Sequence, residues 1–134
     1  MKKVILMVLF LIFGAYMIFS DEVKIYFTNW NYVRRSSLSE DDVLIKPDIF
    51  FHITDQGEIR RLKRHLTSDL VKFEGIVSHV DIVIDFISNE QILETFIVNK
   101  FGFYKKGFDC LYKTPEIILQ RFTFLQLLPK GNEL

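Results

Sequence analysis

Apolar and polar residues alternate along several short stretches of the chain. In the stretch 23–30, Val23, Ile25 and Phe27 fall on one side, and the mostly polar residues between them fall on the other. Alternation with a period of two is the pattern of a half-buried strand. The same pattern predicts further strands at 48–54, at 79–88, at 92–99 with 101–104 as its continuation, and at 108–113.

A different spacing predicts a helix near the middle of the chain. Asp55 followed by Glu58 is typical of a helix start, where a side chain caps the free backbone N–H groups. Ile59, Leu62 and Leu66 then recur at helical spacing and form one apolar stripe. Together these residues predict a helix over about 56–68.

Two further helix starts stand out in the sequence. Ser39 and Asp42 have nearly the spacing of a capping box, which predicts a short helical turn. Thr114, Pro115 and Glu116 supply a cap, a proline at the first helical position and an acid in the first turn. The core face of this C-terminal helix is expected at Ile117, Ile118, Leu125 and Leu128, with its end at Pro129.

The order strand, strand, helix, strand, strand, strand, helix predicts an α+β fold. We expect a two-layer sandwich: a mainly antiparallel sheet of about five strands with two helices on one face, in a single domain at 21–134. Asp81 and Asp85 then fall on the outward face as solvated acids. Cys110 is expected to be a small buried hydrophobe; the alternative in an oxidising compartment is a bridge between chains.

The first 20 residues carry a targeting signal. Lys2 and Lys3 precede an uncharged run of 16 residues, Val4 to Phe19, and Ser20 follows as a small residue at a cleavage site. The run is also close to the roughly 17–25 residues that span a membrane, so an uncleaved anchor is the alternative. Under both interpretations the lysines stay in the cytoplasm and the domain lies outside it, periplasmic, secreted or anchored to the inner membrane. The Met-Lys-Lys start is typical of bacterial signals.

Composition and charge exclude several classes of protein. The chain has 134 residues, 17 basic and 17 acidic, with 49% hydrophobic residues and a single cysteine. An apolar, aromatic-rich chain is not disordered, and one cysteine cannot build a disulfide scaffold. The balanced charge and the export signal argue against a nucleic-acid partner.

No catalytic motif is visible. The three histidines lack metal-ligand spacing, one cysteine cannot complete a common zinc set, and the six glycines are too scattered for a phosphate-binding loop. We therefore expect no catalytic residues, no metal, no cofactor and no enzymatic activity. The alternative is an extracytoplasmic hydrolase whose site would require convergence, within about 3–6 Å, of groups from Asp81, Asp85, Glu94 or His52.

Basic residues are concentrated on the predicted central helix: Arg60, Arg61, Lys63 and Arg64. Like charges at i and i+4 repel, and such a group creates a local positive field despite the balanced total. We interpret it as a docking patch for an acidic partner or for anionic lipid headgroups. The alternative is a solvated helix face neutralised by Glu58, Asp55 and Asp69.

A second candidate binding group combines aromatic residues and arginines. Trp30, Tyr32, Arg34 and Arg35 are of the types enriched at interface hot spots; the alternative is that Trp30 and Tyr32 cap the edge of the core. Near the predicted hairpin, Phe101, Phe103 and Tyr104 are either core residues or an exposed patch.

An export signal, a compact domain without a catalytic motif, and charged patches are typical of small secreted immunity and inhibitor proteins, which cover a surface of their partner. The sequence therefore predicts a non-catalytic protein-binding domain with a protein partner. The alternative is a membrane-tethered envelope protein, held by residues 4–19, with a structural or lipid-facing role.

Overall fold

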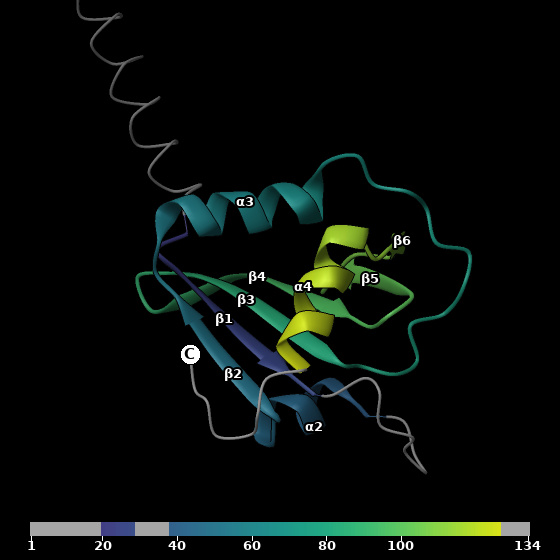
Figure 1. Cartoon of the computed structure of the whole chain (residues 1–134), viewed down its shortest axis with the longest axis horizontal. Coiled ribbons are helices and arrows are strands. Elements are labelled where there is room, and N and C mark those ends of the chain that lie inside the picture. Colours follow the sequence, from purple (N-terminus) through teal and green to yellow (C-terminus); the bar gives the residue numbers. More distant parts are fainter. Residues whose placement is uncertain (1–19, 29–37, 127–134) are drawn as a thin grey trace, which may run out of the picture.

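The computed structural model describes residues 20–28 and 38–126, with side chains up to residue 122. The described chain forms an antiparallel sheet with the strand order β2-β1-β3-β4-β5-β6 (Figure 1). Three helices accompany the sheet, so the predicted α+β class is confirmed. The elements are β1 (Glu22–Phe27), α2 (Glu40–Ile45), β2 (Ile49–Ile53), α3 (Gln56–Thr67), β3 (Ile82–Ser88), β4 (Gln91–Val98), β5 (Gly102–Lys105), β6 (Tyr112–Lys113) and α4 (Glu116–Gln126).

The main core lies between the sheet and helices α3 and α4. The strand register places apolar residues in rows, as where Ile25 lies opposite Phe51 on one side and Ile84 on the other. The rings of Phe27 and Phe122 stack with centroids 5.4 Å apart, which joins β1 to α4. The buried stripe predicted for the central helix, Ile59, Leu62 and Leu66, faces this core.

The opposite face of the sheet carries a smaller cluster. Val43 of α2 packs there with Val80, Val83 and Ile97. The two predicted helices, α3 and α4, share one face of the sheet as expected, whereas α2, expected only as a short helical turn, is a third helix on the opposite face. Its capping box was predicted: the Ser39 side chain accepts from the backbone N–H of Asp42, and the Asp42 carboxylate accepts from the N–H of Ser39. This helix has three acidic residues followed by three apolar ones, a pattern too short to show from the sequence that Val43 covers the sheet.

The predicted continuous strand through 101–104 divides into two antiparallel strands. The Asn99 side-chain oxygen accepts from the N–H groups of Phe101 and Gly102, at 2.8 and 3.0 Å. This side-chain turn reverses the chain, so that β5 folds back along β4. The sheet therefore has six strands, one more than the sequence predicted.

The helix ends agree with the sequence except in detail. Asp55 caps α3 by accepting from Gly57 N–H, without the expected reciprocal contact from Glu58. In α4, Ile118 is buried but Ile117 is half exposed, which corrects its assignment to the core. The expected core residues Leu125 and Leu128, and the stop at Pro129, lie outside the described side chains. No helix within 20–28 and 38–126 is long and apolar enough to cross a membrane, and the predicted signal or anchor segment lies outside these residues.

Candidate functional site

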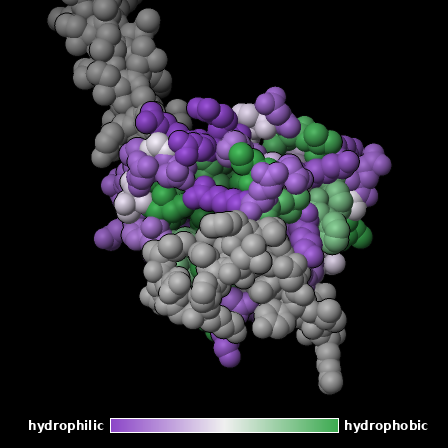
Figure 2. Space-filling model, in the orientation of Figure 1, coloured by the Kyte–Doolittle hydropathy of each residue, from purple (hydrophilic) through white to green (hydrophobic). Residues whose placement is uncertain are grey.

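The basic residues of α3 point in two directions. Arg60, Arg61 and Arg64 are exposed on the side of the helix away from the core, and we call these three the basic face of α3. Arg61 pairs with Glu58 at 2.8 Å, whereas Arg60 makes a 3.3 Å hydrogen bond to the carbonyl of Gln56. The expected convergence of four cations on one exposed face is thus correct for three of them. In Figure 2, hydrophilic residues gather over α3 along the top of the molecule.

Lys63 is directed toward the sheet instead. Its ammonium pairs with Glu94 and lies 4.9 Å from the centroid of the Phe86 ring. Lys105 of β5 contacts the same carboxylate at 3.0 Å. Burial, with a smaller contribution from Lys105, lowers the pKa of Lys63. Lys63 therefore links α3 to β4 through its ion pair with Glu94, and its side chain is less accessible to a partner than those of the three arginines.

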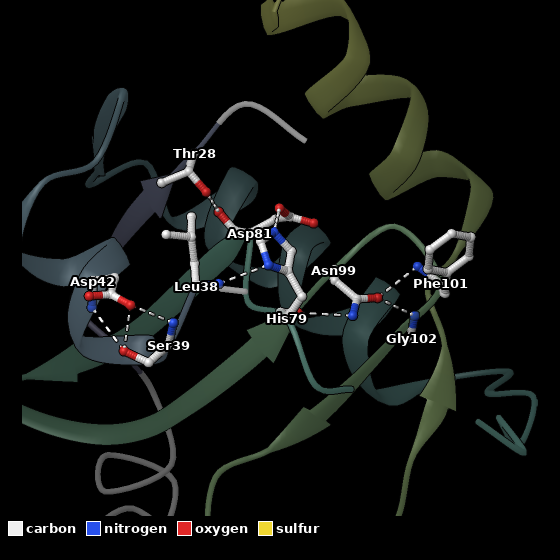
Figure 3. A network of polar contacts seen from close by, with 9 residues as sticks. All are labelled: Thr28, Leu38, Ser39, Asp42, His79, Asp81, Asn99, Phe101 and Gly102. Carbon is white, nitrogen blue, oxygen red and sulfur yellow. Dashed lines mark hydrogen bonds and ion pairs between the residues drawn. The ribbon is translucent and has the colours of Figure 1, made fainter. Parts of the chain in front are cut away.

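The second predicted binding group, Trp30, Tyr32, Arg34 and Arg35, lies outside the described residues. The residues on either side of this group, Thr28 and Leu38, are both hydrogen-bonded to residues 79–81, as Figure 3 shows in part. Before it, both the N–H and the hydroxyl of Thr28 donate to the Asp81 carbonyl, at 2.8 and 3.0 Å. After it, the Leu38 carbonyl accepts from Val80 N–H at 3.0 Å, and Leu38 N–H donates to His79 Nδ1 at 2.9 Å. Residues 79–81 thus hold both ends.

The tautomer of His79 follows from these contacts. Because Nδ1 accepts from Leu38 N–H, the ring proton belongs on Nε2, which donates to the Asp81 carboxylate at 2.9 Å. Asn99 extends the network by donating to the His79 carbonyl at 3.0 Å. No sequence motif marks His79 or Asn99 as functional. The available signal is position: His79 lies shortly before β3 and Asn99 directly follows β4, and buried turns at strand ends need hydrogen bonds.

Asp81 and Asp85 are buried, 3% and 5% exposed, so their interpretation as solvated acids is wrong. Alternation placed them correctly on the second face of β3, but it could not show that α2 and its flanking residues cover that face. The Thr95 hydroxyl donates to Asp85 at 2.6 Å. Burial raises the pKa of Asp85, and this hydrogen bond opposes the rise. Burial and the nearby Asp85 raise the pKa of Tyr26.

The four residues of the alternative hydrolase site do not form one cluster. Asp81 pairs with His79 and Asp85 with Thr95. Glu94 pairs with Lys63 and Lys105 beneath α3, and His52 pairs with Glu22 at 2.7 Å on the far side of the sheet. Each therefore has its own partner. Among the described residues, no group of three or more His, Cys, Asp or Glu side chains is arranged to hold a metal ion.

Cys110 is exposed, contrary to the expectation of a buried thiol. The predicted strand 108–113 is reduced to Tyr112–Lys113, so Cys110 lies in the loop before β6 and not on its inner side. Cys110 raises the pKa of Tyr112 by hydrogen bonding to its side chain. The loop that carries Cys110 belongs to an end of the sheet where large apolar side chains are also exposed.

Five exposed apolar side chains belong to the segments next to β5 and β6, and we call this set the apolar edge: Val71, Ile76, Phe101, Phe108 and Ile117, each between 50% and 82% exposed. The segments that carry them meet at β6. Val71 accepts from Lys113 N–H at 2.7 Å, and Phe101 accepts from Thr114 N–H at 3.2 Å. The three aromatic residues expected to be either core or exposed differ from one another. Phe103 is buried, Tyr104 is half-buried and Phe101 is exposed.

The chain segment behind this edge is fixed in place by Phe73. Phe73 N–H donates to the Leu111 carbonyl at 3.0 Å, and its ring lies against Gly102, where an added Cβ would come within 2.6 Å of the ring. In the sequence, the segment 71–78 is compatible with either a loop or a strand. Its apolar residues follow neither the helical nor the strand period, which is the signal that could have marked them as surface residues.

The described chain is an α+β protein that presents a basic helix face and an apolar sheet edge. Comparison with protein-family models, with curated proteins and with solved structures gives no match.

Proposed function

We propose that the chain is a non-catalytic protein-binding domain of the extracytoplasmic space, acting as an inhibitor or immunity protein that covers a surface of its partner. The observation that carries the proposal is the apolar edge. Of the nine large hydrophobic residues exposed in the described chain, five lie there. Exposed apolar groups gathered in one region are typical of protein-interaction sites.

The surroundings of the apolar edge match those of an interface. Lys72, Lys100 and Lys113 are exposed beside it, and so are Glu74 and Asp109. An apolar centre with a charged rim of both signs is the usual anatomy of a protein–protein contact. Phenylalanine is among the residue types enriched in such centres, so Phe101 and Phe108 are the expected anchors. The expected partner therefore offers an apolar pocket rimmed by charges of both signs.

Capture of the partner tests the proposal. The full chain with a C-terminal tag is expressed in its source cells, crosslinked and purified, and the recovered partner is then purified and rebound to the purified chain. Replacing Phe101 and Phe108 together by Ser is expected to weaken binding at least tenfold for each anchor, because truncating a buried interface anchor costs about 2 kcal/mol or more.

The matched control is Ile45→Ser, because Ile45 is 83% exposed on α2 at the other end of the sheet. Titration by calorimetry measures all variants. Equal affinity of the chain with Phe101 and Phe108 replaced and of the Ile45→Ser chain would contradict the assignment of the apolar edge. The absence of any protein that rebinds the purified chain would contradict the proposed function itself.

A further inference from the structure

The outer side of α3 keeps positive charge that its surroundings do not neutralise. The helix carries four basic residues and one acidic residue, Glu58. That carboxylate is shared, because Arg61 contacts it at 2.8 Å and Arg121 of α4 contacts it at 3.1 Å. Within the part of the chain that the structure describes, neither Arg60 nor Arg64 pairs with a carboxylate. The basic face of α3 therefore retains a net positive charge toward solvent.

This face lies beside the point where the apolar N-terminal run joins the domain. The run Val4 to Phe19 ends directly before Ser20. The carbonyl of Asp21 accepts a hydrogen bond of 3.2 Å from the side chain of Gln56, the first residue of α3. At 1.5 Å per residue, Arg60 and Arg64 lie about 6 and 12 Å along the helix from Gln56. Arg60 and Arg64 therefore follow Gln56 along one side of the helix, starting next to the point where the N-terminal run joins the domain.

We propose that the basic face of α3 docks on the headgroups of an anionic lipid bilayer in which residues 4–19 are anchored. Arginines close to an anionic membrane are attracted to it over about one Debye length, roughly 8–10 Å. An acidic protein could meet the same charges, but the position beside the junction favours the bilayer, because the tether keeps α3 next to it. This surface shares no residue with the apolar edge, so a negative result for one proposal does not contradict the other.

A fluorescence measurement on the full chain tests the docking. Cys110 is replaced by Ser and Thr67 by Cys, which puts a single thiol for the dye at the end of α3, about 17 Å along the axis from Gln56. The labelled chain is reconstituted into phosphatidylcholine vesicles with or without phosphatidylglycerol, both containing a nitroxide-headgroup lipid as quencher. Thr67 approaches the quencher only if α3 lies down on the surface. We expect strong quenching with phosphatidylglycerol, little without it, and loss of quenching as salt is raised.

Charge variants identify the residues responsible. Arg60→Gln with Arg64→Gln is expected to lower the ratio of docked to undocked chain about 25-fold, or about fivefold for each arginine near an anionic surface. Arg60→Lys with Arg64→Lys, which keeps the charge, is expected to retain docking. Lys100→Gln with Lys113→Gln removes the same charge near the apolar edge, and is expected to leave quenching unchanged. Thermal unfolding confirms that all variants are folded.

Several outcomes would overturn the proposal. Equal quenching on neutral and anionic vesicles would mean that the tether alone explains proximity. If Lys100→Gln with Lys113→Gln lowered the quenching as much as Arg60→Gln with Arg64→Gln, only the net charge of the chain would matter. No quenching on either vesicle, with partner capture abolished by the arginine changes, would assign α3 to an acidic protein. A mature chain in cells that begins at Asp21 would remove the anchor.

Discussion

The two faces of the sheet are organised differently, although the strands alternate toward both. The face under α3 and α4 buries one cluster of fourteen apolar residues and keeps its charged groups at the margin. The face under α2 buries only four, together with the carboxyl groups of Asp81 and Asp85. The first face has the composition of a core that supplies stability. The second face has few apolar residues, and buried hydrogen bonds from residues 79–81 hold Thr28 and Leu38 in place there.

This difference separates stability from recognition. Neither proposed interaction surface lies at the centre of a sheet face: the basic face of α3 is outside the main core, and the apolar edge is at β6. Changes on the two sheet faces are therefore expected to alter the free energy of unfolding, and changes at the two surfaces are expected to alter binding.

The largest effect is expected in the main core. Phe86→Ala removes a fully buried ring that meets the Phe96 ring edge-on at 5.6 Å and lies beneath Lys63. The cavity is expected to lower the free energy of unfolding by about 3–5 kcal/mol. Val83→Ala, equally buried on the opposite face, is expected to cost about 2 kcal/mol. Urea denaturation measures both, and a loss at Phe86 no larger than that at Val83 would contradict the cavity expected in the main core.

The second effect concerns the hydrogen bonds of the turn at Asn99. Asn99→Ala leaves the N–H groups of Phe101 and Gly102 without their acceptor in a largely buried turn. The expected loss is about 2–4 kcal/mol, since each unsatisfied buried group costs about 1–3 kcal/mol. Asn99→Asp keeps the acceptor, but its ionised carboxylate would be buried against the His79 carbonyl. It should therefore cost less than Asn99→Ala only at acid pH, where the protonated carboxyl can still donate to that carbonyl, and the comparison is made there. Denaturation of the two variants side by side checks this; a milder alanine variant would contradict the role of the side-chain oxygen.

The third effect is a gain. Because burial raises the pKa of Asp85, the folded carboxyl binds its proton more tightly than the unfolded one. The free energy of unfolding therefore falls as pH rises from the unfolded value, about 3.9, through the raised folded value. Asp85→Asn is expected to remove this fall and to stabilise the protein at neutral pH by about 1 kcal/mol.

Two variants sharpen the test at Asp85. Thr95→Val removes the hydroxyl that opposes the pKa rise, so the loss of stability with rising pH should steepen. Asp109→Asn makes the same charge change as Asp85→Asn at an exposed site and serves as its control. Thermal unfolding of each variant is measured from pH 4 to 8. This range begins near the ordinary carboxyl pKa of about 3.9 and extends above it. A destabilised Asp85→Asn protein at neutral pH would show that the ionised carboxylate is needed for folding.

The smallest effect is expected at the surface. Glu58→Gln breaks the ion pairs with Arg61 and Arg121, whose side chains are 62% and 40% exposed. Exposed pairs contribute little, so the free energy of unfolding should change by no more than about 0.5 kcal/mol. The same change makes the basic face of α3 more positive and should increase quenching on anionic vesicles. A large loss of stability would mean that Glu58 holds α3 and α4 together.

Local sequence signals predicted the elements whose ends are defined by short-range chemistry. The cap at Asp55 and the stripe from Ile59 to Leu66 gave α3 nearly to the residue, and the Ser39 and Asp42 pair gave the start of α2. These signals depend only on neighbouring residues and on one turn of helix. The α+β class followed from the order of such elements.

What the sequence could not supply was which surfaces become covered. Asp85 lies on the second face of β3 as predicted, yet it is buried because elements distant in sequence pack there. Cys110 and Ile117 fall in apolar stretches and are exposed, because the chain around β6 is only briefly extended. The apolar edge was missed for the same reason: it brings together 71–76, 101–108 and 117, which share no local pattern.

The position of β1 has a consequence for the order of events during synthesis. β1 is the first strand to be made, but it lies inside the sheet between β2 and β3, with Phe27 opposite Ile82 and Glu22 opposite Ile87. Its second neighbour is therefore translated only when most of the chain has already emerged. Sheets that depend on pairing between distant segments form slowly. A chain built this way cannot complete its central strand pairing until β3 has been made, so the main core is among the last parts to form.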